Sequence, residues 1–146
     1  MSQIDILMPV PLPQLVREAL DARYRVHKLW LETDKEATLT RIASGIRAVA
    51  TGAPILAEDM VYPISAALMQ RLPKLEIVAN LGVGYDNVDA RWAGDHHICV
   101  TNTPDVLTEE TADTAFGLAL NAVRQFPRAD RYLRDGKWLQ KPFELT

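Results

Sequence analysis

The stretch Leu75-Glu76-Ile77-Val78-Ala79-Asn80-Leu81-Gly82-Val83-Gly84-Tyr85-Asp86-Asn87-Val88-Asp89 contains the signals that decide the fold. Its first part, Leu75 to Ala79, is almost entirely apolar, which is typical of a strand covered on both faces of a parallel sheet. The segment 82–89 contains two glycines and several side chains that favour turns. A short helical segment with Trp92 and a second apolar run, Ile98 to Thr101, follow. The sequence therefore predicts a strand, a turn, a helix and a further strand, which indicates an α/β fold.

The chain before this stretch shows the same alternation of apolar runs and segments of helical period. Three earlier strands are predicted by apolar runs, over residues 4–10, 24–30 and 46–50. Three helices are predicted by apolar spacing, one after Pro13, one capped by Thr33 or Asp34, and one over Ser65 to Leu72. The resulting succession of five strands and four helices predicts a mostly parallel sheet close to a flavodoxin-like domain.

The pattern changes after Thr101. A long helix is predicted from Thr108 to about Phe126, with Thr108 as a cap and with acidic residues in its first turn. Pro127 should interrupt this helix, and a basic amphipathic segment should continue beyond it.

Bulk composition narrows the function. Apolar residues make up 48% of the chain and charged residues 24%, a balance typical of a globular domain. The formal net charge of −3 does not favour a nucleic acid or an acidic membrane as partner. There is no apolar run long enough for a membrane span and no secretion signal in the printed sequence, so we expect a cytoplasmic protein with no membrane partner. The single cysteine, Cys99, lies between Ile98 and Val100, which favours a buried thiol.

Two segments could carry chemistry. The first, Gly82-Val83-Gly84, leaves backbone amides open to an anion, but position 87 is Asn87, so the dinucleotide motif G-x-G-x-x-G is not formed. The alternative is a purely structural turn in which Asp86 or Asn87 caps the short helix. The second, residues 100–113, joins a strand end to a helix start, where anionic ligands bind in α/β proteins. The alternative is a crossover loop rich in capping residues, which the segment by itself slightly favours.

Metal and nucleophile sites are not indicated. The three histidines, His27, His96 and His97, have no third ligand at a helical or strand spacing, so we expect no metal. No serine or cysteine has a histidine and an acid arranged for nucleophilic catalysis.

The order of these segments resembles one family. A strand, G-V-G-Y-D-N-V-D over 82–89, a strand, T-N-T-P-D-V-L-T-E-E-T-A-D over 101–113 and F-G-L-A-L over 116–120 are similar to the D-2-hydroxyacid dehydrogenases. The likeness is greatest to their glyoxylate/hydroxypyruvate and hydroxyphenylpyruvate reductases. The segments L-P-K-L-E-I-V over 72–78 and R-D-G-K-W over 134–138 also fit, so the resemblance covers nearly all of the chain.

The resemblance implies a division of the chain and a set of binding residues. Residues 1–101 would form a flavodoxin-like, parallel-sheet substrate domain. Residues 102–146 would form a hinge and the first long helix of a Rossmann-type dinucleotide-binding domain, and this helix would also form a homodimer. The residues implied are Val83 and Gly84, whose amides would bind the substrate carboxylate, Thr108 and Thr111 near the cofactor, and Trp138, which would reach the neighbouring subunit's substrate or only pack in the dimer interface.

The resemblance also implies what lies outside the 146 residues. The G-x-G-x-x-G loop should follow Thr146, and so should the substrate-orienting arginine, the general acid/base histidine and its acidic partner, so we expect no catalytic residue within the chain. The interpretation is the N-terminal part of an oxidoreductase that reduces small 2-oxo acids such as glyoxylate and hydroxypyruvate with NADPH or NADH. The isolated chain should be inactive. A stand-alone remnant that binds carboxylates or assembles with other subunits is the alternative, which the ending after Phe143-Glu144-Leu145-Thr146 makes the less favoured.

Overall fold

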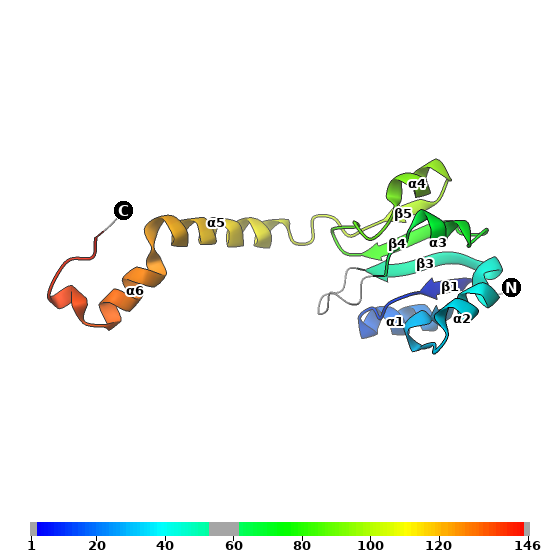
Figure 1. The fold of residues 1–146 in the computed structure, drawn as a ribbon, viewed down its shortest axis with the longest axis horizontal. Coiled ribbons are helices and arrows are strands. Elements are labelled where there is room, and N and C mark those ends of the chain that lie inside the picture. The colour runs from blue at the N-terminus through cyan, green and yellow to red at the C-terminus, as the bar shows by residue number, and fades with distance from the viewer. Residues whose placement is uncertain (1–2, 53–61, 145–146) are drawn as a thin grey trace. The chain divides into compact units, whose positions relative to one another are not determined.

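A computed structural model describes residues 3–52 and 62–144, which divide into two compact units, Met1–Pro104 and Asp105–Thr146. The first unit contains a five-stranded sheet in the order β2-β1-β3-β4-β5 (Figure 1). Its strands are β1 (Asp5–Met8), β2 (Arg25–Lys28), β3 (Ile46–Gly52), β4 (Ile77–Leu81) and β5 (Cys99–Thr101). All neighbouring strands are parallel. This strand order is that of flavodoxin-like folds, so the predicted fold class is confirmed.

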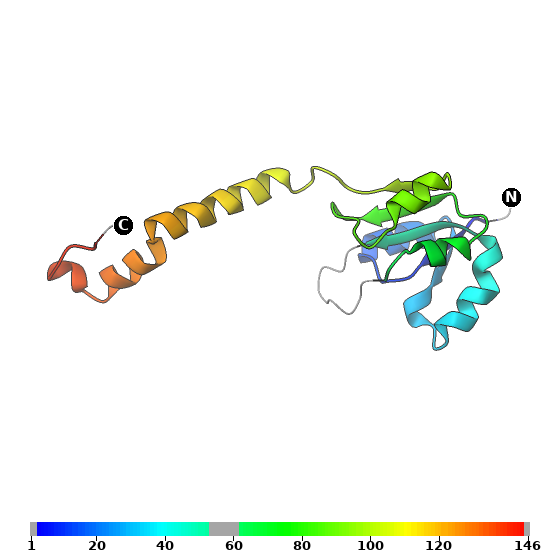
Figure 2. The same ribbon diagram turned by 45° about the horizontal axis from the view of Figure 1, so that its top comes forward.

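The helices of the first unit lie on both faces of the sheet. They are α1 (Gln14–Asp21), α2 (Lys35–Ile42), α3 (Ala66–Gln70) and α4 (Ala90–Asp95). One core cluster packs buried side chains of α2, α3 and α4 against Leu7, Val49 and Val78 of the sheet. The other packs α1 against Ile6 and Met8 from the opposite face (Figure 2). Right-handed crossovers produce this division, because the chain reverses its direction across the sheet only once, after β2.

Side-chain caps fix where three of these helices begin. Asp34 accepts a hydrogen bond from the amide of Ala37, as predicted, and Ser65 accepts one from Leu68. The cap of α4 is Asp89, which accepts from Trp92 at 3.1 Å. The prediction of Asp86 or Asn87 as this cap is wrong, because only Asp89 directly precedes the first helical residue.

All five strands differ from the prediction at one end or at both. β1 is shorter than the predicted run over 4–10, β4 lies two residues beyond the predicted 75–79, and β5 begins one residue after Ile98. The other two differences show the physical reason. The third strand was expected to stop before Thr51, but β3 includes Thr51 and Gly52, which lie in register with Asn80 and Leu81 of β4. The strand predicted over 24–30 ends at Lys28, and Leu29 is buried in a short 3-10 turn. In both cases pairing with a neighbouring strand, rather than local sequence, sets the end.

One face of the sheet is open at the β4–β5 edge within the described residues of this unit. Ala79, Cys99 and Thr101 are all exposed there. The prediction of a buried Cys99 is therefore wrong, and so is the expectation that both faces of β4 are covered. Side chains alternate along β5, so Val100 faces α4 and Cys99 faces the other side of the sheet.

The second unit consists of helices. The predicted long helix is present as α5 (Thr108–Arg124), and α6 (Phe126–Arg134) follows after Gln125, whose φ of 51° breaks the helical path just before Pro127. Thr108 is the first residue of α5, and Leu107 occupies the cap position, so the prediction of Thr108 as the cap is wrong. None of the α5 side chains, all of which are described, is buried. Among the described helices, none has the length and apolar character that crossing a membrane requires.

Candidate functional site

The glycine turn begins directly after β4, and a buried asparagine holds its backbone. Asn80 is 3% exposed, and its Nδ2 donates hydrogen bonds to Gly84 O at 2.9 Å and to Gly82 O at 3.4 Å. The amide of Thr103 also donates to Gly82 O, at 3.0 Å. The turn is therefore tied both to the strand that precedes it and to the segment that follows β5.

A second asparagine holds the residue between these two glycines. Asn102 Nδ2 donates to Val83 O at 2.8 Å. Within the described ranges, neither the Val83 nor the Gly84 amide donates a hydrogen bond. These are the two amides predicted to bind a carboxylate. An anion is a suitable acceptor for backbone amides that donate no hydrogen bond to the protein around them.

The end of β3 lies beside the end of β4. A Cβ atom added to Gly52 would lie 2.8 Å from Leu81 O, so glycine permits this close approach. Thr51 is fully buried and its Oγ1 has no partner among the described residues. Because it follows the third strand, the sequence segment 51–53 is predicted to border the pocket, and position 53 lies outside the described residues.

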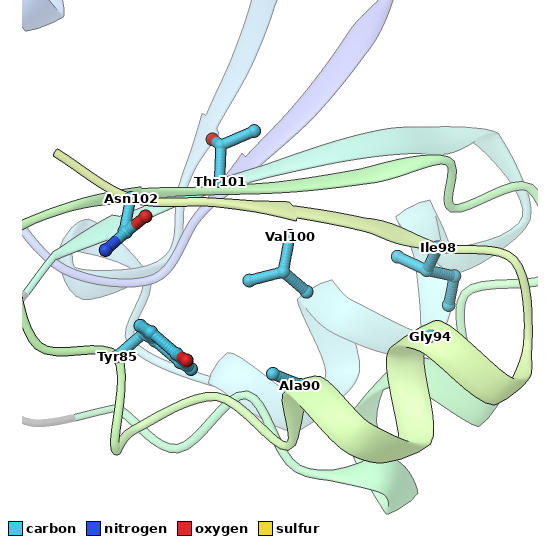
Figure 3. Close-up of a pocket in the computed structure, with 7 residues that line it drawn as sticks. All are labelled: Tyr85, Ala90, Gly94, Ile98, Val100, Thr101 and Asn102. Atoms are coloured by element: carbon cyan, nitrogen blue, oxygen red, sulfur yellow. The ribbon is translucent and has the colours of Figure 1, made fainter. Parts of the chain in front are cut away.

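A hollow of about 320 Å³ lies between α4 and β5, next to the turn (Figure 3). It is lined by Tyr85, Ala90, Gly94, Ile98, Val100, Thr101 and Asn102. None of these side chains is charged, so the hollow offers apolar surface and hydrogen-bonding groups but no counter-ion for an anion. In this unit, the backbone amides of Val83 and Gly84 stay the predicted binding groups for an anion.

The two predicted cofactor residues lie in the second unit, at the start of α5. Thr108 opens the helix, and the amide of Thr111 donates to Leu107 O at 2.9 Å. Thr111 also lines a surface hollow of about 400 Å³ with other side chains of the first turns. Glu109 and Glu110 occupy the first turn, as predicted.

Trp138 also lies in the second unit. It is 56% exposed and lines an apolar hollow of about 410 Å³ together with Leu133 of α6 and Phe143. The ring of Phe143 contacts Tyr132 edge to face, with 5.4 Å between centroids, and this contact orders the segment after α6. The indole of Trp138 therefore lies on the segment that packs against α6, with more than half of its surface exposed.

The histidines have structural contacts. Nε2 of His27, a residue of β2, lies 2.7 Å from Oδ1 of Asp5, the first residue of β1. His96 stacks on Trp92 with 3.7 Å between ring centroids. The part of the chain that the structure describes contains no group of three or more His, Cys, Asp or Glu side chains that could hold a metal ion.

The sequence analysis did not single out Asn80. Its one signal was a polar residue at the end of an otherwise apolar run, Ile77 to Leu81. Only the structure shows that its side chain is buried and bonded to the turn.

The chain matches the family model of the D-isomer specific 2-hydroxyacid dehydrogenase catalytic domain over residues 6–132. It is 39% identical to a glyoxylate/hydroxypyruvate reductase A of Arabidopsis thaliana over 146 residues. The aligned residues make up 100% of this chain and 44% of that protein. Among solved structures, a 2-hydroxyacid dehydrogenase of Ketogulonicigenium vulgare is 36% identical with a TM-score of 0.76, at coverages of 100% and 44%. The NADPH-dependent glyoxylate/hydroxypyruvate reductase of Sinorhizobium meliloti in complex with NADP and malonate is 38% identical with a TM-score of 0.65, at coverages of 99% and 42%.

Proposed function

Since the chain belongs to the D-isomer specific 2-hydroxyacid dehydrogenase family, and spans less than half the length of the relatives it matches, we propose that it is the N-terminal part of an oxidoreductase. The whole protein would reduce small 2-oxo acids such as glyoxylate and hydroxypyruvate with NADPH or NADH. Residues 1–101 would form its substrate-binding domain, and residues 102–146 would form a hinge and the start of its dinucleotide-binding domain. The relatives named as glyoxylate/hydroxypyruvate reductases support this substrate class.

The observation that carries the proposal is that the amides of Val83 and Gly84 donate no hydrogen bond within the described part of the chain. A 2-oxo acid has a carboxylate next to its reacting carbonyl, so amides that bind the carboxylate also orient the carbonyl. Amides do this without placing a buried cation beside the substrate. The Sinorhizobium meliloti reductase was solved in complex with malonate, a small dicarboxylate that shares the carboxylate group of a 2-oxo acid but not its 2-oxo group.

Thr108 and Thr111 are the residues of this chain that would contact the cofactor. They lie at the start of a 17-residue helix, where both hydroxyl groups suit a polar ligand. The Thr108 amide precedes the first helical hydrogen bond and so has no acceptor within the helix, whereas the Thr111 amide is already bonded to Leu107 O. A nicotinamide cofactor, when bound, supplies the hydride. The motif that would hold most of the cofactor lies outside these 146 residues, so the chain's own contribution is contact at the helix start.

The side chain of Trp138 would contact a neighbouring subunit. Its exposed indole fits either contact with the partner's substrate or apolar packing in a homodimer interface formed by α5. The exposed apolar side chains of α5, Phe116 and Leu118 among them, support the homodimer.

The alternative is a non-catalytic carboxylate-binding or assembly module. The same two amides favour it, because they would bind carboxylates even where no hydride transfer occurs. The 146-residue chain by itself is expected to be inactive, because it contains no general acid/base suited to the reaction.

The test begins with the intact mass of the protein as it occurs in its source. A mass near twice 16.3 kDa would be followed by assays of NADPH and NADH oxidation with glyoxylate and with hydroxypyruvate. Turnover of either acid by the whole protein, and none by the 146-residue chain, is the expected result. A protein of 16.3 kDa that binds carboxylates without turnover would support the alternative instead.

A further inference from the structure

We propose that Asn80 and Asn102 are positioning residues, which leave the substrate untouched and turn the amides of the glycine turn outward to bind its carboxylate. This inference rests on the proposed function. The inference goes beyond the proposed function because it names the side chains that give the turn its geometry.

Peptide geometry connects the held carbonyls to the free amides. In a trans peptide, the carbonyl oxygen of one residue and the amide hydrogen of the next point in opposite directions, and no described peptide of this chain is cis. Gly82 O is held by Asn80 Nδ2 and by the amide of Thr103. The amide of Val83 therefore points away from these donors.

The next two peptides repeat this arrangement. Asn102 donates to Val83 O, so the amide of Gly84 points away from the Asn102 side chain. Asn80 donates to Gly84 O, so the amide of Tyr85 points away from the Asn80 side chain. Within the described residues the Tyr85 amide also donates no hydrogen bond, so it is a third candidate donor to the ligand.

The burial of Asn80 supports a dedicated role. Its Oδ1 is buried and has no partner in the described part of the chain, a state that costs stability. An apolar side chain would avoid this cost, as Val78 does two residues earlier on the same face. The hydrogen bonds from Asn80 Nδ2 to the turn offset this loss of stability.

The sheet brings the two asparagines together. Ala79 of β4 and Thr101 of β5 are register partners, and each asparagine is the next residue along its own segment. Both therefore lie at the same level of the carboxyl edge of the sheet. From there they contact neighbouring carbonyls of one turn.

The experiment replaces Asn80 by aspartate in the whole protein. Asn80→Asp keeps the shape of the side chain but replaces the donor by a carboxylate, which repels the two carbonyls. We expect KM for glyoxylate and the Kd of oxamate, its non-reducible amide analogue, to rise roughly 10- to 100-fold. The kcat and the Kd of NADPH should change far less, because the loss affects carboxylate binding. Gln70→Glu, an amide-to-carboxylate change at the exposed end of α3, is the matched control and should leave both affinities unchanged.

The pH dependence separates positioning from general damage. A protonated aspartic acid donates a hydrogen bond, so oxamate affinity of Asn80→Asp should recover toward wild type as the pH falls. The wild-type and Gln70→Glu proteins should show no such recovery. Asn102→Asp, at a half-buried position, serves as a second variant if Asn80→Asp does not fold, and should weaken oxamate binding in the same direction.

Each outcome has one meaning. A wild-type protein that reduces glyoxylate while Asn80→Asp and Asn102→Asp bind oxamate normally would overturn the positioning roles and leave the proposed function intact. A wild-type protein that binds oxamate but reduces no 2-oxo acid, with affinity lost in the variants, would support the positioning roles without the reaction. A wild-type protein that neither binds oxamate nor reduces the acids would overturn both.

Discussion

A substitution at Gly84 can remove the proposed donor amide and leave every other residue of the chain unchanged. Gly84→Pro removes the amide hydrogen, so it should raise KM for the 2-oxo acid in the whole protein, by about tenfold or more. Gly84→Ala keeps the amide, and its Cβ would lie 3.2 Å from the movable Asp86 Oδ2, so its effect on KM should be smaller. Steady-state kinetics of both variants provides the measurement. An unchanged KM in a folded Gly84→Pro protein would remove this amide from the site.

Gly52 is required by close packing. A Cβ at this position would lie 2.8 Å from Leu81 O, and the obstacle is backbone rather than a flexible side chain. Gly52→Ala should therefore lower the free energy of unfolding by roughly 1–3 kcal/mol, measured by urea denaturation. Gly94→Ala is the control, because nothing lies within 4 Å of its added Cβ, and it should raise stability by about 0.5–1 kcal/mol. Equal effects of the two substitutions would contradict this account.

The end of α4 is a Schellman motif that contains histidine where glycine is usual. The amide of Ile98 donates to Ala93 O, the amide of His97 donates to Gly94 O, and His97 has a φ of 60°. His97→Gly should raise the free energy of unfolding by about 0.5–1 kcal/mol, because glycine adopts this conformation without steric cost. His96→Gly, one residue earlier at a φ of −110°, should instead lower it, since the stacking on Trp92 is lost. A loss of stability in both variants would refute the assignment.

Tyr62 makes the packing of α2 and α3 sensitive to alkaline pH. Burial raises the pKa of its hydroxyl above the ordinary value of 10.0, the nearby Glu36 adds to the rise, and Arg71 opposes it. As the pH rises past 10.0, Tyr62 loses its hydroxyl proton in the unfolded chain but keeps it in the folded chain. Deprotonation therefore favours the unfolded chain, and the free energy of unfolding falls until the pH passes the higher pKa of the folded chain. Tyr62→Phe lacks this loss. The difference in unfolding free energy between wild type and Tyr62→Phe should therefore shrink between pH 8 and pH 11, and a constant difference would argue against it.

At the scale of the whole molecule, exposed apolar side chains concentrate on the second unit. Phe116 is 67% exposed and Leu139 is 90% exposed. The purified 146-residue chain should therefore self-associate or aggregate, as measured by light scattering at increasing concentration. Replacing Phe116 and Leu120 of α5 by serine should reduce this association, whereas serine at the exposed Leu15 of α1 should not. A monodisperse monomer for the unaltered chain would contradict the prediction.

Local signals in the sequence determined the elements and the fold class. The apolar runs, Pro13, Asp34 and Ser65 marked strands and helix starts, because caps and periodicity act over a few residues. The segments over 82–89 and 101–113 also indicated the family, which the match over residues 6–132 confirms. Val83, Gly84, Thr108, Thr111 and Trp138 were named from that resemblance, and their roles stay predictions.

Only the tertiary structure decided which side chains lie together and which are covered. Cys99 has apolar neighbours in sequence, yet it is exposed, because alternation along an edge strand turns it to a face that nothing covers in the described first unit. Asn80 lay one residue beyond the predicted strand and was given no role, yet it belongs to β4, is buried and donates hydrogen bonds to the carbonyls of Gly82 and Gly84. The turn owes its geometry to the pairing of β4 with β5, which brings Asn102 beside it. Such pairing depends on residues distant in the chain, and local sequence does not specify them.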